Sequence, residues 1–190
     1  MVIKNYFKSL RGFKKNILSL FFSIIPAVIA VIVIYTFGKE VYLPIAVILL
    51  NFYFAIGVGW ITSPLIGLVT GISPIWIVVF LVFISSQSSL IVAVNYDILE
   101  KIPYLGKLMI NIRKKADKVV QKNVLAKNIS FMGLFWLMFL PIYGTGPMVM
   151  SMVGRILSLQ WWKVWLTITI SAILRFSLVV IIVHYGFLKL

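Results

Sequence analysis

The stretch GVGWITSPLIG at residues 57–67 has a counterpart in GTGPMVMSMVG at residues 144–154. Both stretches interrupt long apolar runs, and each is followed by a helix-length apolar segment. Paired, broken hydrophobic segments in the two halves of a small membrane protein indicate a transport site at the interface between repeats. We therefore predict an internal repeat with an offset of 87 residues, whose hairpin turns carry the following residues: Gly57, Gly59, Gly67, Pro141, Gly144, Gly146 and Gly154.

Composition indicates an integral membrane protein. The chain of 190 residues is 62% hydrophobic, has a mean hydropathy of +1.10 and contains only 12% charged residues, whereas soluble domains average roughly 25%. This length accommodates one membrane domain and no additional soluble domain. Cysteine is absent from the sequence, which excludes disulfides, thiolate metal sites and a thiol nucleophile.

The charge is strongly one-sided. Lysine and arginine number 18 against 4 acidic residues, which gives a formal net charge of +14. We expect the basic residues to flank membrane segments on the cytoplasmic side and to contact the anionic headgroups of membrane lipids. Nucleic acid is not an expected partner, because the chain has no separate basic domain to bind it.

Apolar runs and amphipathic patterns divide the chain into segments. A continuous run of about 20 apolar residues is long enough to cross the hydrocarbon core of a bilayer as a helix. Basic residues between apolar residues at helical spacing instead indicate a helix that lies on the membrane surface. In chain order we predict a basic amphipathic helix at 1–16, a span at 17–37, a first repeat at 41–95 with its span at 75–94, a basic amphipathic helix at 97–127, and a second repeat at 129–186 with its span at 161–185.

The distribution of charge then decides the topology. If every apolar stretch crossed the membrane, the basic regions 1–16 and 97–127 would lie on opposite sides, against the positive-inside rule. If 41–73 and 129–159 instead enter and leave on the same side as re-entrant hairpins, 15 of the 18 basic residues are cytoplasmic. The two halves are then inverted relative to each other. We predict a plasma-membrane protein whose N-terminus and 97–127 loop are cytoplasmic.

The predicted fold is therefore all-α. It is a polytopic membrane protein with two re-entrant helical hairpins in an inverted repeat and about three full transmembrane helices. Non-helical backbone at membrane depth is tolerated only where it is buried in protein or lines a wet cavity, so the glycines and prolines favour an internal site. The alternative is that small residues let the helices pack closely, which needs no cavity.

Arg175 lies near the middle of the last predicted span. A charged side chain at that depth costs between roughly 3 and 17 kcal/mol, so it should face polar partners or an anionic ligand. The offset of 87 pairs it with Ser88, one of five consecutive polar residues at 85–89 that should face the bundle interior. Our hypothesis is that Arg175, Gln87, Ser88 and Ser89 approach one substrate site. The alternative is that Arg175 donates hydrogen bonds to backbone carbonyls at a hairpin tip.

Three further residues are candidates for binding substrate. Asn51 is the polar residue in the first half of the first hairpin, and Thr145 lies at the turn of the second. Arg155 follows the second set of glycines. It either extends to the membrane interface as a snorkelling side chain or attracts anionic headgroups.

Little in the sequence indicates catalysis. The four acidic residues lie outside the deep parts of the spans, and the single histidine is near the end of the last span. Enzymes that cleave bonds inside the membrane with metals, or that transfer phosphoryl groups, need clusters of such residues. We therefore expect no enzyme activity, no metal site and no cofactor.

The sequence LPIYGTG at residues 140–146 resembles the small multidrug export family, in which a proline and a Gly-Thr-Gly turn open the second half. The resemblance covers residues 41–186 and extends more distantly to the DedA/VTT group. It implies paired re-entrant hairpins and movement of lipids between leaflets. Asn51 stands where the family has an acidic residue. No deep carboxylate is then left to carry protons, so we expect passive exchange rather than ion-coupled pumping.

These observations predict a membrane transporter or lipid scramblase-like protein that moves a small amphiphile or anionic lipid across the bilayer. Arg175 would balance the charge of the ligand, and the hairpin tips would form the gate. The alternative is a non-transporting membrane subunit or assembly factor whose basic surface docks partner proteins. The sequence leaves open whether the chain forms a homo-oligomer. An ion channel is not favoured, because no ring of acidic residues or filter motif is present.

Overall fold

The computed structural model describes residues 21, 23–36, 38–55, 58–99, 124–140 and 146–187. Among these residues the regular secondary structure is entirely helical, as the sequence predicts. Several predicted features lie outside the described residues. They are the amphipathic helix at 1–16, most of the 97–127 segment, Gly57, Pro141, Gly144 and Thr145.

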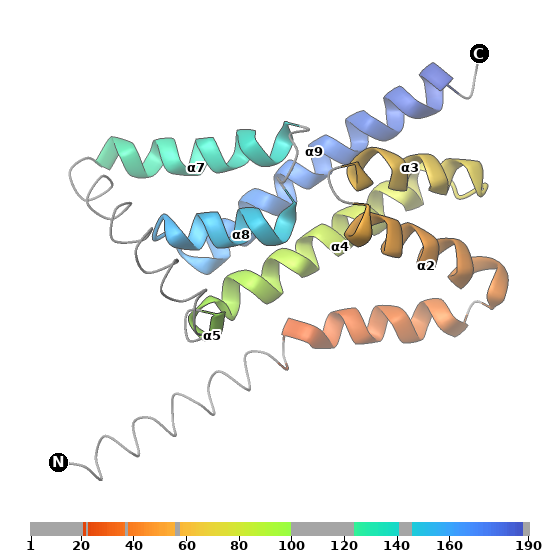
Figure 1. Ribbon diagram of the computed structural model, residues 1–190, viewed down its shortest axis with the longest axis horizontal. Helices are drawn as coiled ribbons and strands as arrows, with labels where there is room; N and C mark the ends of the chain where they lie inside the picture. Colours follow the sequence, from red (N-terminus) through yellow and green to blue (C-terminus); the bar gives the residue numbers. More distant parts are fainter. Residues whose placement is uncertain are drawn as a thin grey trace, which may run out of the picture.

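Figure 1 shows the described helices in chain order. An apolar helix at Ser23–Thr36 comes first. Proline occupies the first position of two later helices, where its missing N–H would have no partner within the helix anyway. The labelled helices are α2 (Lys39–Phe54), α3 (Gly59–Val69), α4 (Pro74–Val94), α5 (Tyr96–Leu99), α7 (Val124–Phe139), α8 (Pro147–Ile156) and α9 (Trp161–Phe187).

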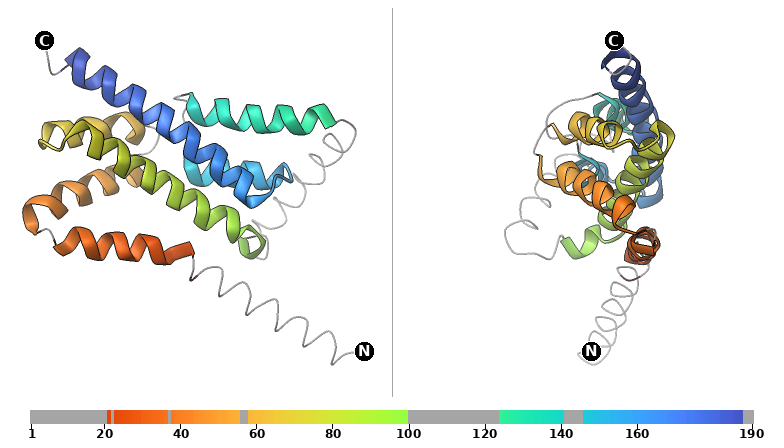
Figure 2. Two further views of the ribbon diagram at one scale, coloured as in Figure 1. Left: turned by 180° about the vertical axis from the view of Figure 1, so that it is seen from behind. Right: turned by 90° about the vertical axis from the view of Figure 1, so that its right-hand side faces the viewer.

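The centre of the bundle is formed by α4 and α9. The segments Pro74–Val94 and Trp161–Gly186, of 21 and 26 residues, are long and apolar enough to cross a membrane by length and composition. They run side by side in opposite directions (Figures 1 and 2). They coincide with the spans that the sequence predicts at 75–94 and 161–185. The predicted span at 17–37 overlaps the helix Ser23–Thr36, which is shorter within the described residues.

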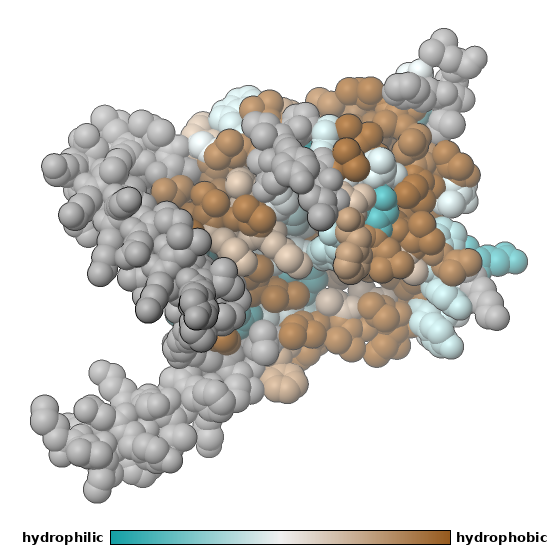
Figure 3. Space-filling model, in the orientation of Figure 1, coloured by the Kyte–Doolittle hydropathy of each residue, from teal (hydrophilic) through white to brown (hydrophobic). Residues whose placement is uncertain are grey.

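The distribution of polar and apolar side chains on α9 is the reverse of that on a surface helix of a soluble protein: polar residues are buried and apolar residues are exposed. Its polar residues Thr167, Ser171 and Arg175 are buried. On the face shown in Figure 3, large apolar areas make up much of the described surface, and exposed apolar areas of this size are expected of a protein surrounded by lipid. On α9 the exposed aliphatic residues are Leu166, Ile170, Ile173, Leu174, Leu178, Ile181 and Ile182.

Two pairs of shorter helices accompany α4 and α9. Within the described residues, the helices α2, α3, α7 and α8 are about 15–24 Å long, which is less than the ~30 Å hydrocarbon core of a bilayer. The pair α2–α3 packs together as one helical hairpin, and the pair α7–α8 forms the second. The hairpins point toward each other from opposite ends of the α4–α9 pair, and α2 and α7 both end near its middle (Figure 1).

The end of α3 shows how the first hairpin connects to its long helix. The N–H of Ile72 donates to the carbonyl of Gly67 at 3.0 Å, and the N–H of Gly71 donates to that of Leu68 at 3.1 Å. These two hydrogen bonds form a Schellman motif, which ends a helix on a residue in the left-handed conformation. Gly71 holds this position with φ 80°. Glycine adopts it without strain because it has no Cβ.

The end of α8 repeats this arrangement 87 residues later. The N–H of Leu159 donates to the carbonyl of Gly154 at 3.1 Å, and the N–H of Ser158 donates to that of Arg155 at 3.0 Å. Ser158 holds the left-handed position with φ 60°. The offset inferred from the glycines is therefore present in the backbone, and it extends to positions at which the residue types of the two halves differ.

Gly67 and Gly154 let the short helices approach the long ones. A Cβ at Gly67 would lie 2.8 Å from Cδ1 of Ile77 in α4, and a Cβ at Gly154 would lie 2.8 Å from Cγ2 of Val164 in α9. Ile77 and Val164 are themselves 87 residues apart. Close packing through small residues therefore explains these two glycines.

The two hairpins nevertheless differ in conformation. A Cβ at Gly59 would lie 2.8 Å from the carbonyl oxygen of Asn51, whereas a Cβ at its counterpart Gly146 would meet no atom of the described residues within 4 Å. The helix α7 packs along α9, while α2 packs mainly on α3 and has no comparable contact with α4. In the first hairpin α2 packs mainly on α3, whereas in the second hairpin α7 packs on the long helix α9.

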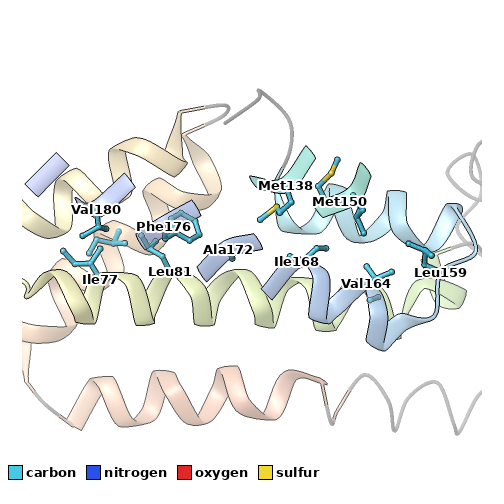
Figure 4. Close-up of a cluster of buried hydrophobic side chains, with 13 residues drawn as sticks. Ile77, Leu81, Met138, Met150, Leu159, Val164, Ile168, Ala172, Phe176 and Val180 are labelled. Atoms are coloured by element: carbon cyan, nitrogen blue, oxygen red, sulfur yellow. The ribbon is translucent and has the colours of Figure 1, made fainter. Parts of the chain in front are cut away.

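The hydrophobic core runs along the α4–α9 pair and is covered by residues of both hairpins (Figure 4). Side chains from both long helices interdigitate there with methionines from α7 and α8. The buried residues drawn in the figure include Ile77, Leu81, Met138, Met150, Leu159, Val164, Ile168, Ala172, Phe176 and Val180. This core fixes the position of α9, which carries the buried arginine.

We predict that Gly59→Ala lowers the free energy of unfolding by about 1–3 kcal/mol, because its methyl group would meet backbone atoms that no side-chain rotation can move. Gly133→Ala is the matched control, since Gly133 lies within α7 and a Cβ there meets none of the described atoms within 4 Å. Unfolding of the purified protein in detergent measures both variants. Equal stability of the two variants would contradict the close contact between α2 and α3.

Candidate functional site

Arg175 lies in the middle of α9 and is buried, with a relative exposure of 4%. Its Nη1 donates a hydrogen bond to the carbonyl oxygen of Met138 at 3.1 Å. Its Cζ lies 4.8 Å from the centre of the Trp60 ring, which is a cation–π distance. Met138 is at the end of α7, and Trp60 is at the start of α3. Arg175 therefore contacts the tips of both helical hairpins.

The carbonyl of Met138 lies in the last turn of α7, which ends at the next residue, Phe139. The last four carbonyls of a helix have no partner within the helix, and the helix dipole leaves partial negative charge there. Both effects stabilise a guanidinium at this position. The arrangement is the one expected if Arg175 donates to a backbone carbonyl at a hairpin tip.

One donor group of Arg175 is not used by the described residues. Its Nε is buried and has no hydrogen-bond partner among them. A guanidinium carries five N–H donors in a planar fork that fits the oxygens of a carboxylate or a phosphate. Arg175 thus combines a positive charge with unused hydrogen-bonding capacity at the point where the two hairpins meet.

The polar residues in the middle of α4 face the bundle interior, as the sequence predicts. Ser88 shares a hydrogen bond with the hydroxyl of Tyr53 near the end of α2. Ser89 accepts a hydrogen bond from Ser151 of α8 at 2.9 Å. These two serines therefore join α4 to one helix from each hairpin.

Gln87 points toward a third element. Its Nε2 donates to the backbone carbonyl of Ser23 at 2.8 Å. About two turns further along, Asn95 Nδ2 donates to the hydroxyl of Ser23 at 2.9 Å. The two amides attach the first apolar helix to α4. The structure thus places Gln87 where it holds this helix, and a role in binding substrate stays a prediction.

The register between α4 and α9 separates Arg175 from the serines. Ser86 Oγ accepts hydrogen bonds from Trp165 Nε1 at 2.8 Å and from Thr169 Oγ1 at 3.0 Å. Arg175 is six residues beyond Thr169, which places it about 9 Å from this contact along α9. Ser88 is two residues beyond Ser86, which places it about 3 Å from the contact along α4. Because the two helices are antiparallel, these two displacements have opposite directions. The two residues therefore lie at levels about 12 Å apart rather than in one cluster. Binding of one substrate by both stays a prediction.

Asn51 joins the two helices of the first hairpin. Its Nδ2 donates to Thr62 Oγ1 at 2.7 Å and to Ser63 Oγ at 2.9 Å. Ser63 Oγ in turn donates to the carbonyl of Ile48 at 3.3 Å. Both amide hydrogens are thus used between α2 and α3. A role of Asn51 in binding substrate stays a prediction, and Thr145 lies outside the described residues.

Arg155 lies where α8 turns into α9, at the end of the bundle. Its Nη1 donates to the carbonyl of Leu159 at 3.0 Å, and its Nη2 lies 3.6 Å from Oδ1 of Asp97. Its Cζ lies 5.3 Å from the centre of the Tyr96 ring. Arg155 therefore connects α8 to α5 and does not approach Arg175. Attraction of anionic headgroups by Arg155 stays a prediction.

Tyr53 and Trp60 are the site residues that sequence reasoning misses. They contact Ser88 and Arg175, and they lie on either side of the break between α2 and α3. In a chain with 15% aromatic residues neither stands out. Their position next to a glycine break in an apolar run is the signal that could have found them.

Comparison with known proteins gives one family match. The model of a family described as "Putative small multi-drug export protein" matches residues 43–178, which is well over half of the chain. This is the family that the sequence at residues 140–146 resembles. No curated protein and no solved structure matches the chain.

We predict that Asn51→Ala lowers the free energy of unfolding by about 1–3 kcal/mol, because the buried hydroxyl of Ser63 and the half-buried hydroxyl of Thr62 lose their donor. Thr70→Val is the control, since the Thr70 hydroxyl bonds only to carbonyls of its own helix. It should change the free energy of unfolding by less than about 0.5 kcal/mol. If Asn51→Ala cost no more than the control, Asn51 would not hold the hairpin together.

Proposed function

Because the chain belongs to the small multi-drug export protein family, we propose that it is a membrane transporter, and that its substrate is a small amphiphile with an anionic headgroup. More specifically, we propose that it moves an anionic lipid passively between the two leaflets of the bilayer. The observation that carries it is Arg175, a buried cation that contacts the tips of both helical hairpins. An intramembrane ionisable residue is by default a candidate for a substrate pathway.

Helix length and polarity support a membrane arrangement in which α4 and α9 cross and both hairpins re-enter. Within the described residues each hairpin helix is shorter than the hydrocarbon core, and each hairpin begins and ends at the same end of the α4–α9 pair (Figure 1). A re-entrant arrangement places 15 of the 18 basic residues on the cytoplasmic face. The N-terminus and the 97–127 segment are then cytoplasmic.

The charges favour an anionic ligand over a cationic one. In the described part of the chain, Glu40 is exposed near the start of α2, and Asp97 is close to Arg155 at the other end of the bundle. Neither acid compensates the charge of Arg175. A buried guanidinium without a carboxylate partner attracts an anion and repels a cation. The proposed substrate is therefore an amphiphile that carries a phosphate or a carboxylate.

The unequal packing of the hairpins supports their role as the gate. The helix α7 packs along α9, whereas α2 has no comparable contact with α4. In transporters built from inverted repeats, one repeat moves against the other around a fixed site. We propose a second state in which α2 docks on α4 and α7 leaves α9. Arg175 then loses the Met138 carbonyl and is available to the ligand.

We predict that the purified protein in liposomes accelerates exchange of a fluorescent anionic phospholipid between leaflets, measured by dithionite quenching of the outer leaflet. Arg175→Gln removes the charge and should lower the exchange rate roughly tenfold or more, because a hydrogen bond to a charged group is lost. Arg175→Lys keeps the charge and should retain part of the rate. Lys163→Gln removes an equal charge at the start of α9, beside Trp162, and should not change the rate.

Three outcomes would count against this proposal in different ways. Wild-type protein that exchanges no lipid would contradict the function itself. A folded Arg175→Gln variant with the full exchange rate would contradict the role of Arg175. If Arg175→Gln does not fold, the guanidinium serves to hold the hairpin tips, as its hydrogen bond to Met138 allows.

A further inference from the structure

Ser85 carries a buried hydroxyl that the described residues do not use. Its side chain is 0% exposed, and its Oγ has no hydrogen-bond partner among them. Other buried serines behave differently, since Ser88, Ser89 and Ser171 all form hydrogen bonds. Buried polar groups in native proteins are nearly always satisfied, and an exception indicates a functional role or an additional partner.

Ser85 faces the region between the two hairpins. It precedes Ser88 and Ser89 by three and four residues, so the three side chains lie on one face of α4. Ser88 contacts Tyr53 from α2, and Ser89 contacts Ser151 from α8. The face of α4 that carries Ser85 is therefore bordered by the first hairpin and by the second.

Arg175 supplies a second unused donor inside the bundle. Its Nε is buried and has no partner in the part of the chain that the structure describes. The hydrogen bond between Thr169 and Ser86 fixes the relative level of the two helices. By this register Arg175 lies about 7–8 Å from Ser85 along the bundle axis. Two unsatisfied groups at this separation suit a ligand with two polar parts better than a single small ion.

We propose that Ser85 and Arg175 bind the headgroup of one anionic amphiphile. Arg175 binds its phosphate, and the Ser85 hydroxyl binds a hydroxyl group further along the headgroup. This inference rests on the proposed function and narrows its substrate class to phospholipids whose headgroup carries hydroxyls beyond the phosphate, such as phosphoglycerol. A lipid that ends in a bare phosphate satisfies Arg175 and leaves Ser85 without a partner.

The test compares how tightly two short-chain lipids bind to the purified full-length protein in detergent. Binding is measured as the rise in the thermal unfolding temperature with lipid concentration. The probes are dihexanoyl phosphatidylglycerol and dihexanoyl phosphatidic acid. Wild-type protein should bind phosphatidylglycerol roughly three- to tenfold more tightly, which is the gain from one hydrogen bond. Ser85→Ala should abolish this preference and leave binding of phosphatidic acid unchanged. Without lipid it should unfold at a higher temperature than wild type, because an unsatisfied buried hydroxyl is removed.

Thr167→Val is the matched control. Thr167 is buried, and its hydroxyl bonds to the carbonyl of Lys163 one turn earlier in the same helix. This variant should keep the lipid preference. The proposal is overturned if Ser85→Ala still prefers phosphatidylglycerol, or if it unfolds at a lower temperature than wild type without lipid. Binding that depends on Ser85 in a protein that exchanges no lipid would support this site and contradict only the proposed function.

Discussion

Arg175 donates a hydrogen bond to the carbonyl of Met138 at the point where α7 stops in the middle of the bundle. In an unbroken helix that oxygen would accept the N–H of the residue four positions further along. A guanidinium would then share an oxygen that is already bonded within the helix, and it would lack the partial negative charge of a helix end, which helps to offset the cost of burying a charge in an apolar interior. The helix break and the buried charge thus explain each other. Trp60 extends the contact to the first hairpin, so one side chain meets both hairpin tips.

The offset of 87 residues shows what the two halves share and where they diverge. The hydrogen bonds that end α3 recur at the end of α8, and Gly67 and Gly154 meet side chains that are themselves counterparts. The first hairpin, however, is closed by Asn51 and by the close approach at Gly59. The second hairpin has no such closure in the described residues and packs on α9 instead. A repeat with two unequal conformations is the arrangement from which a gate can be built.

Much of the fold can be predicted from local features of the sequence. Continuous apolar runs predict both long helices, and the structure begins them at Pro74 and Trp161, within one residue of the prediction. Glycines in an apolar run predict that 41–73 and 129–159 are not single helices. Five polar residues in the middle of a span predict an inward-facing stripe, because lipid cannot satisfy them. Each of these inferences depends on short-range pattern alone.

The arrangement of the site cannot be predicted in this way. The offset pairs Arg175 with Ser88, which suggests that the two are close, but in an antiparallel repeat counterpart residues lie on opposite sides of the centre. Their separation follows from the register at Ser86, where hydrogen bonds from Trp165 and Thr169 meet. That register depends on packing between helices, and periodicity within one helix does not determine it. The distant resemblance to the DedA/VTT group also stays a prediction, since the family match is to the small multi-drug export proteins.

Arg175 can contact both hairpin tips inside the membrane only if each hairpin returns to the membrane face from which it enters. Since the chain has no cysteine, single cysteines can be introduced at exposed positions. Suitable substitutions are Glu40→Cys at the start of α2, Ser73→Cys just after α3 and Gln160→Cys after α8. In sealed vesicles of one orientation, a membrane-impermeant maleimide should label the first two from the same side and the third from the opposite side. Labelling of Glu40→Cys and Ser73→Cys from opposite sides would contradict the re-entrant arrangement.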